Sequence, residues 1–243
     1  MKNIYILLIV TGFLGCEKDV SLTFSSKKIN SETCNNCPAI DIDVPQAIPE
    51  NKVSTKINDH ITGFAINILN YSEDHAVKNI EEGIKVFNSD FKSLNNNFSD
   101  SMIAWEASIQ GKVSFINDEI ASLKFEHYLF TGGAHGYGGN SFLNFNVNNG
   151  DKIKNEELFK DYKKFRDFAE KKFRVQENIP EGESINSTGF LFEDDIFILP
   201  ANIGFTNEGI ELIYNPYEIN VYSEGNVILK IPFEEVNEFL AIK

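Results

Sequence analysis

The sequence predicts an α+β protein in which helices pack on one face of antiparallel sheets. Three observations lead to this fold class. Apolar residues at three- and four-residue steps run without a gap from Val77 to Phe98 and predict a long amphipathic helix. Alternating apolar and polar residues then run from Ile103 to Phe130 and predict strands. Helical spacing returns before a second group of strands, and helices and strands grouped in this way are typical of α+β folds.

The N-terminal stretch that ends at Cys16 is similar to the export signal of a bacterial lipoprotein. An apolar run from Ile4 to Leu14 follows a lysine and is too short to span a bilayer as a mature helix. Gly15 stands directly before Cys16, as in the lipobox where such signals are cleaved and the cysteine is lipidated. We therefore expect residues 1–15 to be a signal peptide, with an ordinary signal and an incidental cysteine as the alternative. Lipidation would place the protein in the bacterial cell envelope, outside the cytoplasm, with the lipid as its only membrane anchor.

Residues 16–53 are polar and show no sustained periodicity, so we expect them to form a tether. The tether contains Cys34 and Cys37, and such a pair in an exported protein predicts a local disulfide. Thioredoxin-like redox chemistry would need a strand before this motif and a helix after it. A zinc site would need two further ligands, and the sequence has no second Cys pair or paired His. We therefore expect neither a metal nor a cofactor.

The elements that follow the tether are predicted in chain order. Residues 54–70 place Ile57, Ile61 and Ile68 on one face of a helix, with Ser54 or Thr55 as its N-cap. The helix over 77–98 follows, and its apolar stripe is expected to pack on a sheet. Gly111 and Asn117-Asp118 are expected to form turns between strands.

The stretch YLFTGGAHGYGGNSFLNFN, residues 128–146, joins two of these strands through five glycines and His135. Glycine marks positions that need a positive φ or a close approach of the backbone. The glycines lie between strands, so no helix N-terminus is available there to bind a phosphate. No His, Cys or carboxylate stands at ligand spacing from His135, which favours a hydrogen-bonded turn residue over a catalytic base.

The C-terminal part continues with a helix over 155–175, a loop at 180–183, and three strands over 190–199, 204–214 and 227–231. A short helix over 233–240 is expected to close the chain after Pro232. Asp194 and Asp195 fall on an expected strand, where they are interpreted as charges that block edge-to-edge pairing.

The segment YNPYEINVYSEG, residues 214–225, is rich in tyrosine around a turn at Asn215-Pro216. Tyrosine supplies a large contact area with a polar tip, which suits a recognition surface. A turn whose rings pack on the sheet explains the same pattern equally well.

Two long strings resemble the DUF3298 domain over about residues 125–240. They are YLFTGGAHGYGGNSFLNFNVNNGDKIKNEELF and DDIFILPANIGFTNEGIELIYNPYEINVYSEGNVILKIPFEEV. The preceding residues occupy the place of a DUF4163-type region. With the N-terminal features described above, the resemblance gives four expected parts: a signal peptide (1–15), a tether (16–53), a DUF4163-like α+β region (54–124) and a DUF3298-like α+β domain (125–243).

The family occurs as envelope lipoproteins, beside polysaccharide deacetylase domains, and as the lysozyme-binding outer part of an anti-sigma factor. The formal charge of −14 argues against a nucleic-acid partner and would attract a basic one. Together these features predict a non-catalytic binding module for a cationic protein such as lysozyme, or for a cell-wall glycan. The expected ligand-binding residues are His135, Tyr137, Pro216, Tyr217, Glu218 and Tyr222. The alternative is a glycan- or peptidoglycan-modifying enzyme in which His135 acts with Asp194 or Asp195.

Overall fold

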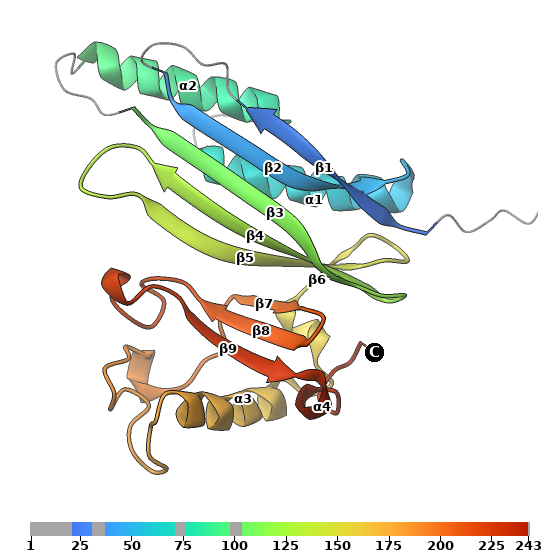
Figure 1. Ribbon diagram of the computed structural model, residues 1–243, viewed down its shortest axis with the longest axis vertical. Helices are drawn as coiled ribbons and strands as arrows, with labels where there is room; N and C mark the ends of the chain where they lie inside the picture. The colour runs from blue at the N-terminus through green and yellow to red at the C-terminus, as the bar shows by residue number, and fades with distance from the viewer. Residues whose placement is uncertain (1–20, 31–36, 71–75, 98–103, 243) are drawn as a thin grey trace, which may run out of the picture.

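Two β-sheets organise the chain, and each carries its own hydrophobic core (Figure 1). The computed structural model describes residues 21–30, 37–70, 76–97 and 104–242. The first sheet has the strand order β1-β2-β3-β4-β5-β6 and the second β7-β8-β9. The strands of the first sheet are β1 Thr23–Asn30, β2 Ala39–Ile48, β3 Glu106–Ile116, β4 Ile120–Phe130, β5 Tyr137–Asn146 and β6 Lys152–Ile153. Those of the second sheet are β7 Asn202–Phe205, β8 Gly209–Tyr214 and β9 Val227–Pro232.

Four α-helices accompany the two sheets in the described part of the chain. They are α1 Lys52–Leu69, α2 Ile80–Asn97, α3 Tyr162–Gln176 and α4 Phe233–Val236. Three short 3₁₀ turns add η1 Asn155–Leu158, η2 Glu193–Asp195 and η3 Tyr222–Glu224. This combination of helices and open sheets is the predicted α+β class.

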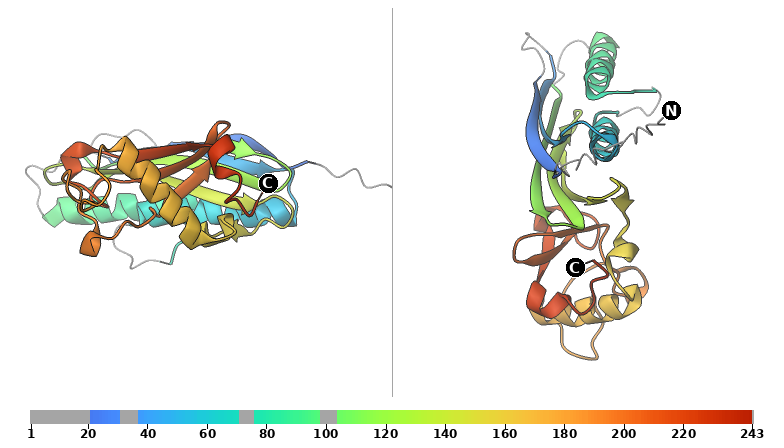
Figure 2. Two further views of the ribbon diagram at one scale, coloured as in Figure 1. Left: turned by 90° about the horizontal axis from the view of Figure 1, so that it is seen from below. Right: turned by 90° about the vertical axis from the view of Figure 1, so that its right-hand side faces the viewer.

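The two long helices lie on the same face of the six-stranded sheet (Figure 2). Helix α1 buries Ile57, Ile61 and Leu69, and helix α2 packs Phe87 and Phe91 against the indole of Trp105. Both helices were predicted from their apolar stripes, and both are confirmed.

The N-cap of α1 lies a turn earlier than expected. Asn51 Oδ1 accepts the amides of Val53 and Ser54, and Ser54 Oγ accepts the Asn51 amide in return. Ser54 is therefore the N3 partner of a capping box rather than the cap itself.

One strand pair of the six-stranded sheet departs from the antiparallel prediction. Strands β2 and β3 are parallel, whereas the other pairs of this sheet are antiparallel. Helices α1 and α2 form the connection between β2 and β3. A crossover of this length returns the chain to the same end of the sheet, which makes the next strand parallel.

The expected tether over 16–53 is wrong for its described strands, because β1 and β2 are built into the sheet. In IDIDV, residues 40–44, the apolar side chains are buried and the aspartates between them face outward, so polar composition concealed a period of two. Strand β1 forms the edge of the sheet. Cys37 is disulfide-bonded. Cys34 and Cys16 lie outside the described residues, so their pairing and lipidation stay predictions.

Gly111 does not form the expected turn and lies inside β3, directly opposite Phe125 on β4. A Cβ at this position would fall 2.6 Å from the Phe125 ring and 2.7 Å from Pro45 Cδ. The glycine therefore serves a close approach between strands. The turn expected at Asn117-Asp118 is confirmed, with Asn117 Oδ1 accepting two amides that follow it.

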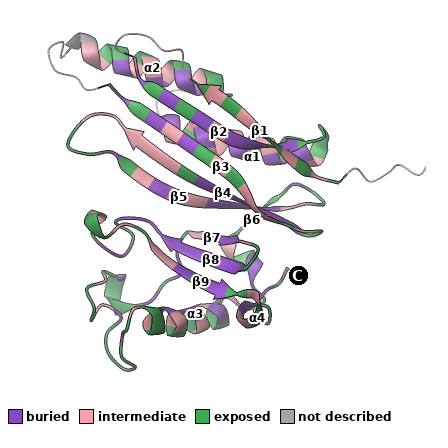
Figure 3. Cartoon of the chain, viewed as in Figure 1, coloured by how far each residue is buried: buried purple, intermediate pink, exposed green. Residues whose placement is uncertain are grey.

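The three-stranded sheet forms the C-terminal unit of the protein together with α3 and α4. Helix α3 covers one face of this sheet, and every residue of β8 is buried (Figure 3). The strand expected over 204–214 is the β7–β8 hairpin. The strand expected over 190–199 is wrong, because Asp194 and Asp195 adopt φ values of 52° and 59° and form η2. Asp195 accepts a hydrogen bond from Ser184, so these acids are not edge-strand charges.

The two units dock through buried polar groups on the face of the first sheet that α1 and α2 leave uncovered. Ser122 Oγ donates to Asn144 Oδ1 at 2.7 Å and accepts the Phe205 amide at 3.0 Å. Asn144 Nδ2 donates to the Ile203 carbonyl at 2.8 Å. Side chains of β4 and β5 thereby satisfy the free backbone edge of β7, which would otherwise be buried without partners.

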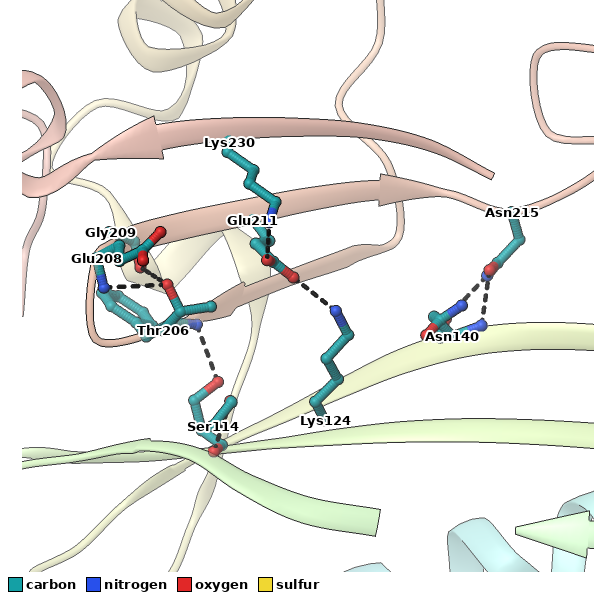
Figure 4. A network of polar contacts seen from close by, with 11 residues as sticks. Ser114, Lys124, Asn140, Thr206, Glu208, Gly209, Glu211, Asn215 and Lys230 are labelled. Carbon is teal, nitrogen blue, oxygen red and sulfur yellow. Dashed lines mark hydrogen bonds and ion pairs between the residues drawn. The ribbon is translucent and has the colours of Figure 1, made fainter. Parts of the chain in front are cut away.

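A partly buried ion pair crosses the same interface (Figure 4). Lys124 Nζ of β4 lies 2.6 Å from Glu211 Oε2 of β8, and Lys230 Nζ of β9 lies 3.3 Å from Glu211 Oε1. Burial alone would raise the pKa of Glu211, but the hydrogen bonds and charges of the two lysines hold it below its usual range. The carboxylate is therefore charged when the units are docked.

Candidate functional site

A groove lies where the uncovered face of the first sheet meets the segment that follows β8. Alternation along β4 places Leu123 and Phe125 in the core under the helices and turns Lys124, Glu126 and Tyr128 to the other face. The groove has a volume of about 520 Å³. Its lining includes Gln110, Glu126, Tyr128 and Asn140 from the sheet and Pro216, Tyr222, Ser223 and Asn226 from the C-terminal unit.

The glycine-rich stretch around His135 shapes one end of this groove. Gly132 and Gly133 have φ values of 97° and 99° and turn the chain between β4 and β5. A Cβ on Gly136 would fall 2.3 Å from the Tyr128 hydroxyl oxygen, so this glycine makes room for a groove side chain. The interpretation of the stretch as a connection between strands is confirmed.

His135 is exposed and hydrogen-bonded within its own turn. Its Nδ1 lies 2.9 Å from the Gly136 carbonyl oxygen, to which the Tyr222 hydroxyl also donates at 3.1 Å. The His135 ring stacks on Tyr222 with centroids 4.6 Å apart, and Tyr217 stacks on Tyr222 at 5.5 Å. We call these three rings the aromatic stack; it holds the His135 turn against the C-terminal unit.

Asn215 fixes the tyrosine-rich segment to the sheet edge (Figure 4). Its side-chain oxygen accepts the Asn140 amide at 2.7 Å, and its side-chain nitrogen donates to the Asn140 carbonyl at 2.9 Å. Strand β6 pairs only with Asn144 and Phe145, so this part of the β5 edge is open to a side chain. The Asn215 side chain therefore makes the hydrogen bonds to the Asn140 backbone that a neighbouring strand would otherwise make.

Glu218 lies beside this dock. Partial burial raises the pKa of its carboxyl, and hydrogen bonds from Asn215 oppose the rise. Burial raises the pKa of the Tyr137 hydroxyl, and the Glu218 charge adds to this effect. Tyr137 and Tyr217 are 45% and 59% exposed, so two rings of this region face solvent.

The structure brings the predicted site residues together only in part. His135, Tyr217 and Tyr222 form the aromatic stack, Pro216 and Tyr222 line the groove, and Tyr137 lies near Glu218. Their role in binding stays a prediction. The pairing of His135 with Asp194 or Asp195 is not found among the described residues: His135 contacts Gly136 and Tyr222 instead, and η2 belongs to another loop.

Sequence reasoning missed the sheet side of the groove. The residues concerned are Ser108, Gln110, Glu126, Tyr128 and Asn140. Their signal was present in the alternation of β3 and β4, whose second face carries polar and aromatic residues. The sequence cannot distinguish such a face from an ordinary solvated surface, because it does not show that a second unit stands beside it.

His127 forms part of the groove wall but is built into the fold. Its ring meets Phe64 of α1 edge-on with centroids 5.9 Å apart, and burial lowers its pKa. A neutral, packed imidazole of this kind supports structure. In the part of the chain that the structure describes, no group of three His, Cys, Asp or Glu side chains could hold a metal ion. No helix there is both long and apolar enough to cross a membrane.

Two family models match the chain. Residues 30–137 match the one described as Deacetylase PdaC, and residues 156–234 match the one described as Protein of unknown function (DUF3298). The C-terminal part therefore contains a DUF3298 domain, as the resemblance implied. The N-terminal match corrects the DUF4163-type assignment, and the expected division at 124/125 falls inside β4. A search of the curated proteins found no match.

Two crystal structures of DUF3298-family proteins share this fold. One, from Bacteroides fragilis NCTC 9343, aligns with a TM-score of 0.64 and 21% identity over 90% of this chain and 94% of that chain. The other, from Pseudomonas aeruginosa PAO1, gives a TM-score of 0.61 and 20% identity over 91% of this chain and 94% of that chain. At these identities the likeness concerns the fold.

Proposed function

We propose that this protein is a non-catalytic binding module of the bacterial cell envelope that holds a cell-wall glycan in the groove. The observation that carries the proposal is the lining of the groove. Tyr128 offers a ring on which the apolar face of a sugar can lie, and amide, hydroxyl and carboxylate groups stand beside it. Tyr222, whose ring stacks with His135 and Tyr217, borders the same groove. A concave site with aromatic walls and a few convergent polar groups suits a small or polymeric ligand.

The setting at the cell wall has support of its own. The model that matches residues 30–137 is named for a deacetylase, and the N-terminal sequence resembles a lipoprotein signal. A lipid at Cys16 would hold the groove close to the envelope surface.

The surroundings of His135 support a non-catalytic role. A general acid or base must lie within hydrogen-bond reach of the proton that it transfers, and it is usually oriented by a second group. His135 is directed at a carbonyl of its own turn, and no carboxylate contacts it among the described residues. The groove holds Glu126 without a second carboxylate in its described lining, so the paired acids of a glycosidase are not in place.

A cationic protein such as lysozyme is a second candidate partner. Tyr137 and Tyr217 present exposed rings in the region of Glu218, on a chain with a formal charge of −14. Such a surface would speed association with a basic protein, in a way that weakens with salt.

Isothermal titration of the intact chain with chitohexaose tests the glycan proposal. We expect saturable binding that weakens about fivefold in Gln110→Ala or Asn226→Ala, because each variant removes a hydrogen bond worth about 1 kcal/mol. Glu181→Gln, exposed in the 180–183 loop and outside the groove, is the control and should bind like the native chain. Hen lysozyme as titrant separates the candidates: binding to lysozyme alone would reject the glycan groove.

A further inference from the structure

A second hollow of about 330 Å³ adjoins the groove on the same face of the sheet. Gln110, Glu126 and Asn140 line both spaces, so one extended ligand can occupy the two together. What distinguishes the second hollow is a pair of lysines, Lys112 of β3 and Lys124 of β4.

The two lysines are direct neighbours across the strands. Lys112 pairs with Lys124 in the antiparallel register of β3 and β4. Side chains in this relation have Cβ atoms about 4.5–5.5 Å apart, and like charges placed there destabilise the sheet. Such a pair of lysines can bind an anion, because a negative charge between the two ammonium groups would relieve their repulsion.

The protein balances only one of the two charges. Lys124 is paired with Glu211, which Lys230 also contacts. Lys112 is exposed and makes no ion pair among the described residues. Glu126 also lines the hollow but lies beyond ion-pair distance of both lysines. Among the side chains that line the hollow, two lysines stand against the single carboxylate of Glu126, which leaves one positive charge in excess.

The overall acidity of the chain does not cancel this local excess. The formal charge of −14 is spread over the whole sequence. At physiological ionic strength, charges are screened beyond about 8 Å, so an anion in the hollow responds mainly to the groups that line it. The net charge of the protein governs its long-range attraction or repulsion of a charged ligand, but it does not determine the potential inside a hollow of this size.

We propose that the Lys112–Lys124 hollow is an anion subsite, and that the ligand of the groove is an acidic glycan with a sugar carboxylate between the two lysines. This inference rests on the proposed function and adds the class of sugar to it. The chain of the glycan would run from the lysines past Gln110, Glu126 and Asn140 to the tyrosines.

A matched pair of oligosaccharides tests the subsite. Hyaluronan tetrasaccharide alternates glucuronate with N-acetylglucosamine, and chitotetraose is an uncharged counterpart. By calorimetry at 150 mM NaCl, where the distant charges of the chain are screened, we expect the native chain to bind the acidic sugar about tenfold more tightly, with a preference that shrinks at 500 mM NaCl. Lys112→Gln should abolish the preference, so that the two sugars bind with similar affinity. Lys163→Gln, exposed on α3 in the other unit, should keep it.

The outcomes separate the two levels of the proposal. Equal affinity for both sugars, or a preference that survives Lys112→Gln, overturns the subsite and leaves the glycan groove standing. Failure of both sugars to bind overturns the groove as well. Thermal unfolding of Lys112→Gln should match or exceed that of the native chain, since the variant removes a like-charge contact, so lost binding would not reflect lost folding.

Discussion

At the residue scale, Tyr222 links the two halves of the candidate site. Its ring stacks with both His135 and Tyr217, and its hydroxyl donates to the Gly136 carbonyl. Aromatic pairs of this kind contribute about 0.5–1.5 kcal/mol beyond burial of area. Tyr222 also lines the groove, so the same side chain fixes the loop and faces the ligand space.

Glu218 gives a pH-dependent prediction. Its pKa is raised in the folded state, so the folded protein binds a proton more tightly than the unfolded chain does. Stability therefore falls as pH rises from the unfolded pKa through the folded pKa, and the ionised carboxyl is unfavourable above that window. We expect Glu218→Gln to be more stable than the native chain at pH 7 and to lose this advantage at pH 3. Melting temperatures at the two pH values check this, and an equal difference at both would contradict it.

Residue roles could be predicted from the sequence where they are local. The glycines and His135 form a turn, as their position between strands indicated. The partner of His135 could not be predicted, because Tyr222 lies far along the chain and only the docking of two units brings the rings together. The same holds for Asn215, whose partner is the backbone of Asn140.

At the element scale, side-chain size controls how closely β7 approaches β5. Gly204 of β7 faces Phe142 of β5, and a Cβ there would fall 1.9 Å from a ring carbon. The ring is packed between the sheets and has little freedom to move away. The close packing of the two units therefore requires a residue without a side chain at position 204.

Replacement of Gly204 and of Gly63 by alanine should change the free energy of unfolding in opposite directions. Gly204→Ala should lower the free energy of unfolding by about 1–3 kcal/mol, the usual cost of overpacking. Gly63→Ala is the matched control: it lies within α1 with nothing near its missing Cβ, so alanine should raise stability by up to about 1 kcal/mol. Urea denaturation measures both, and a Gly204→Ala protein as stable as the native chain would refute the close docking.

Elements with strong periodicity could be predicted, and those governed by long-range contacts could not. The apolar stripes of α1 and α2 are long enough to predict a helix from the local sequence alone. Strand β2 was hidden by its aspartates, and the 190–199 segment alternates like a strand although η2 interrupts it. In that segment Phe192 and Phe197 reach the same Phe173 ring on either side of the turn, and tertiary packing overrides the local pattern.

At the scale of the whole molecule, the groove exists because two sheets meet at a face and an edge. The helices cover one face of the first sheet, and the C-terminal unit covers only part of the other (Figure 2). The uncovered remainder, bounded by the tyrosine-rich segment, becomes concave. Composition and net charge describe the chain as a whole and could not reveal a local hollow with paired lysines.

The most direct measurement of the central claim is a map of amide shifts in the nitrogen-15 NMR spectrum during titration with chitohexaose. We predict that the largest shifts cluster at Gln110, Glu126, Asn140 and Asn226, with smaller ones at Tyr128 and Tyr222. The amides of α3, on the far side of the C-terminal unit, should not move. A spectrum without shifts at saturating sugar, or shifts centred outside the groove, would contradict the assignment of this groove as a glycan site.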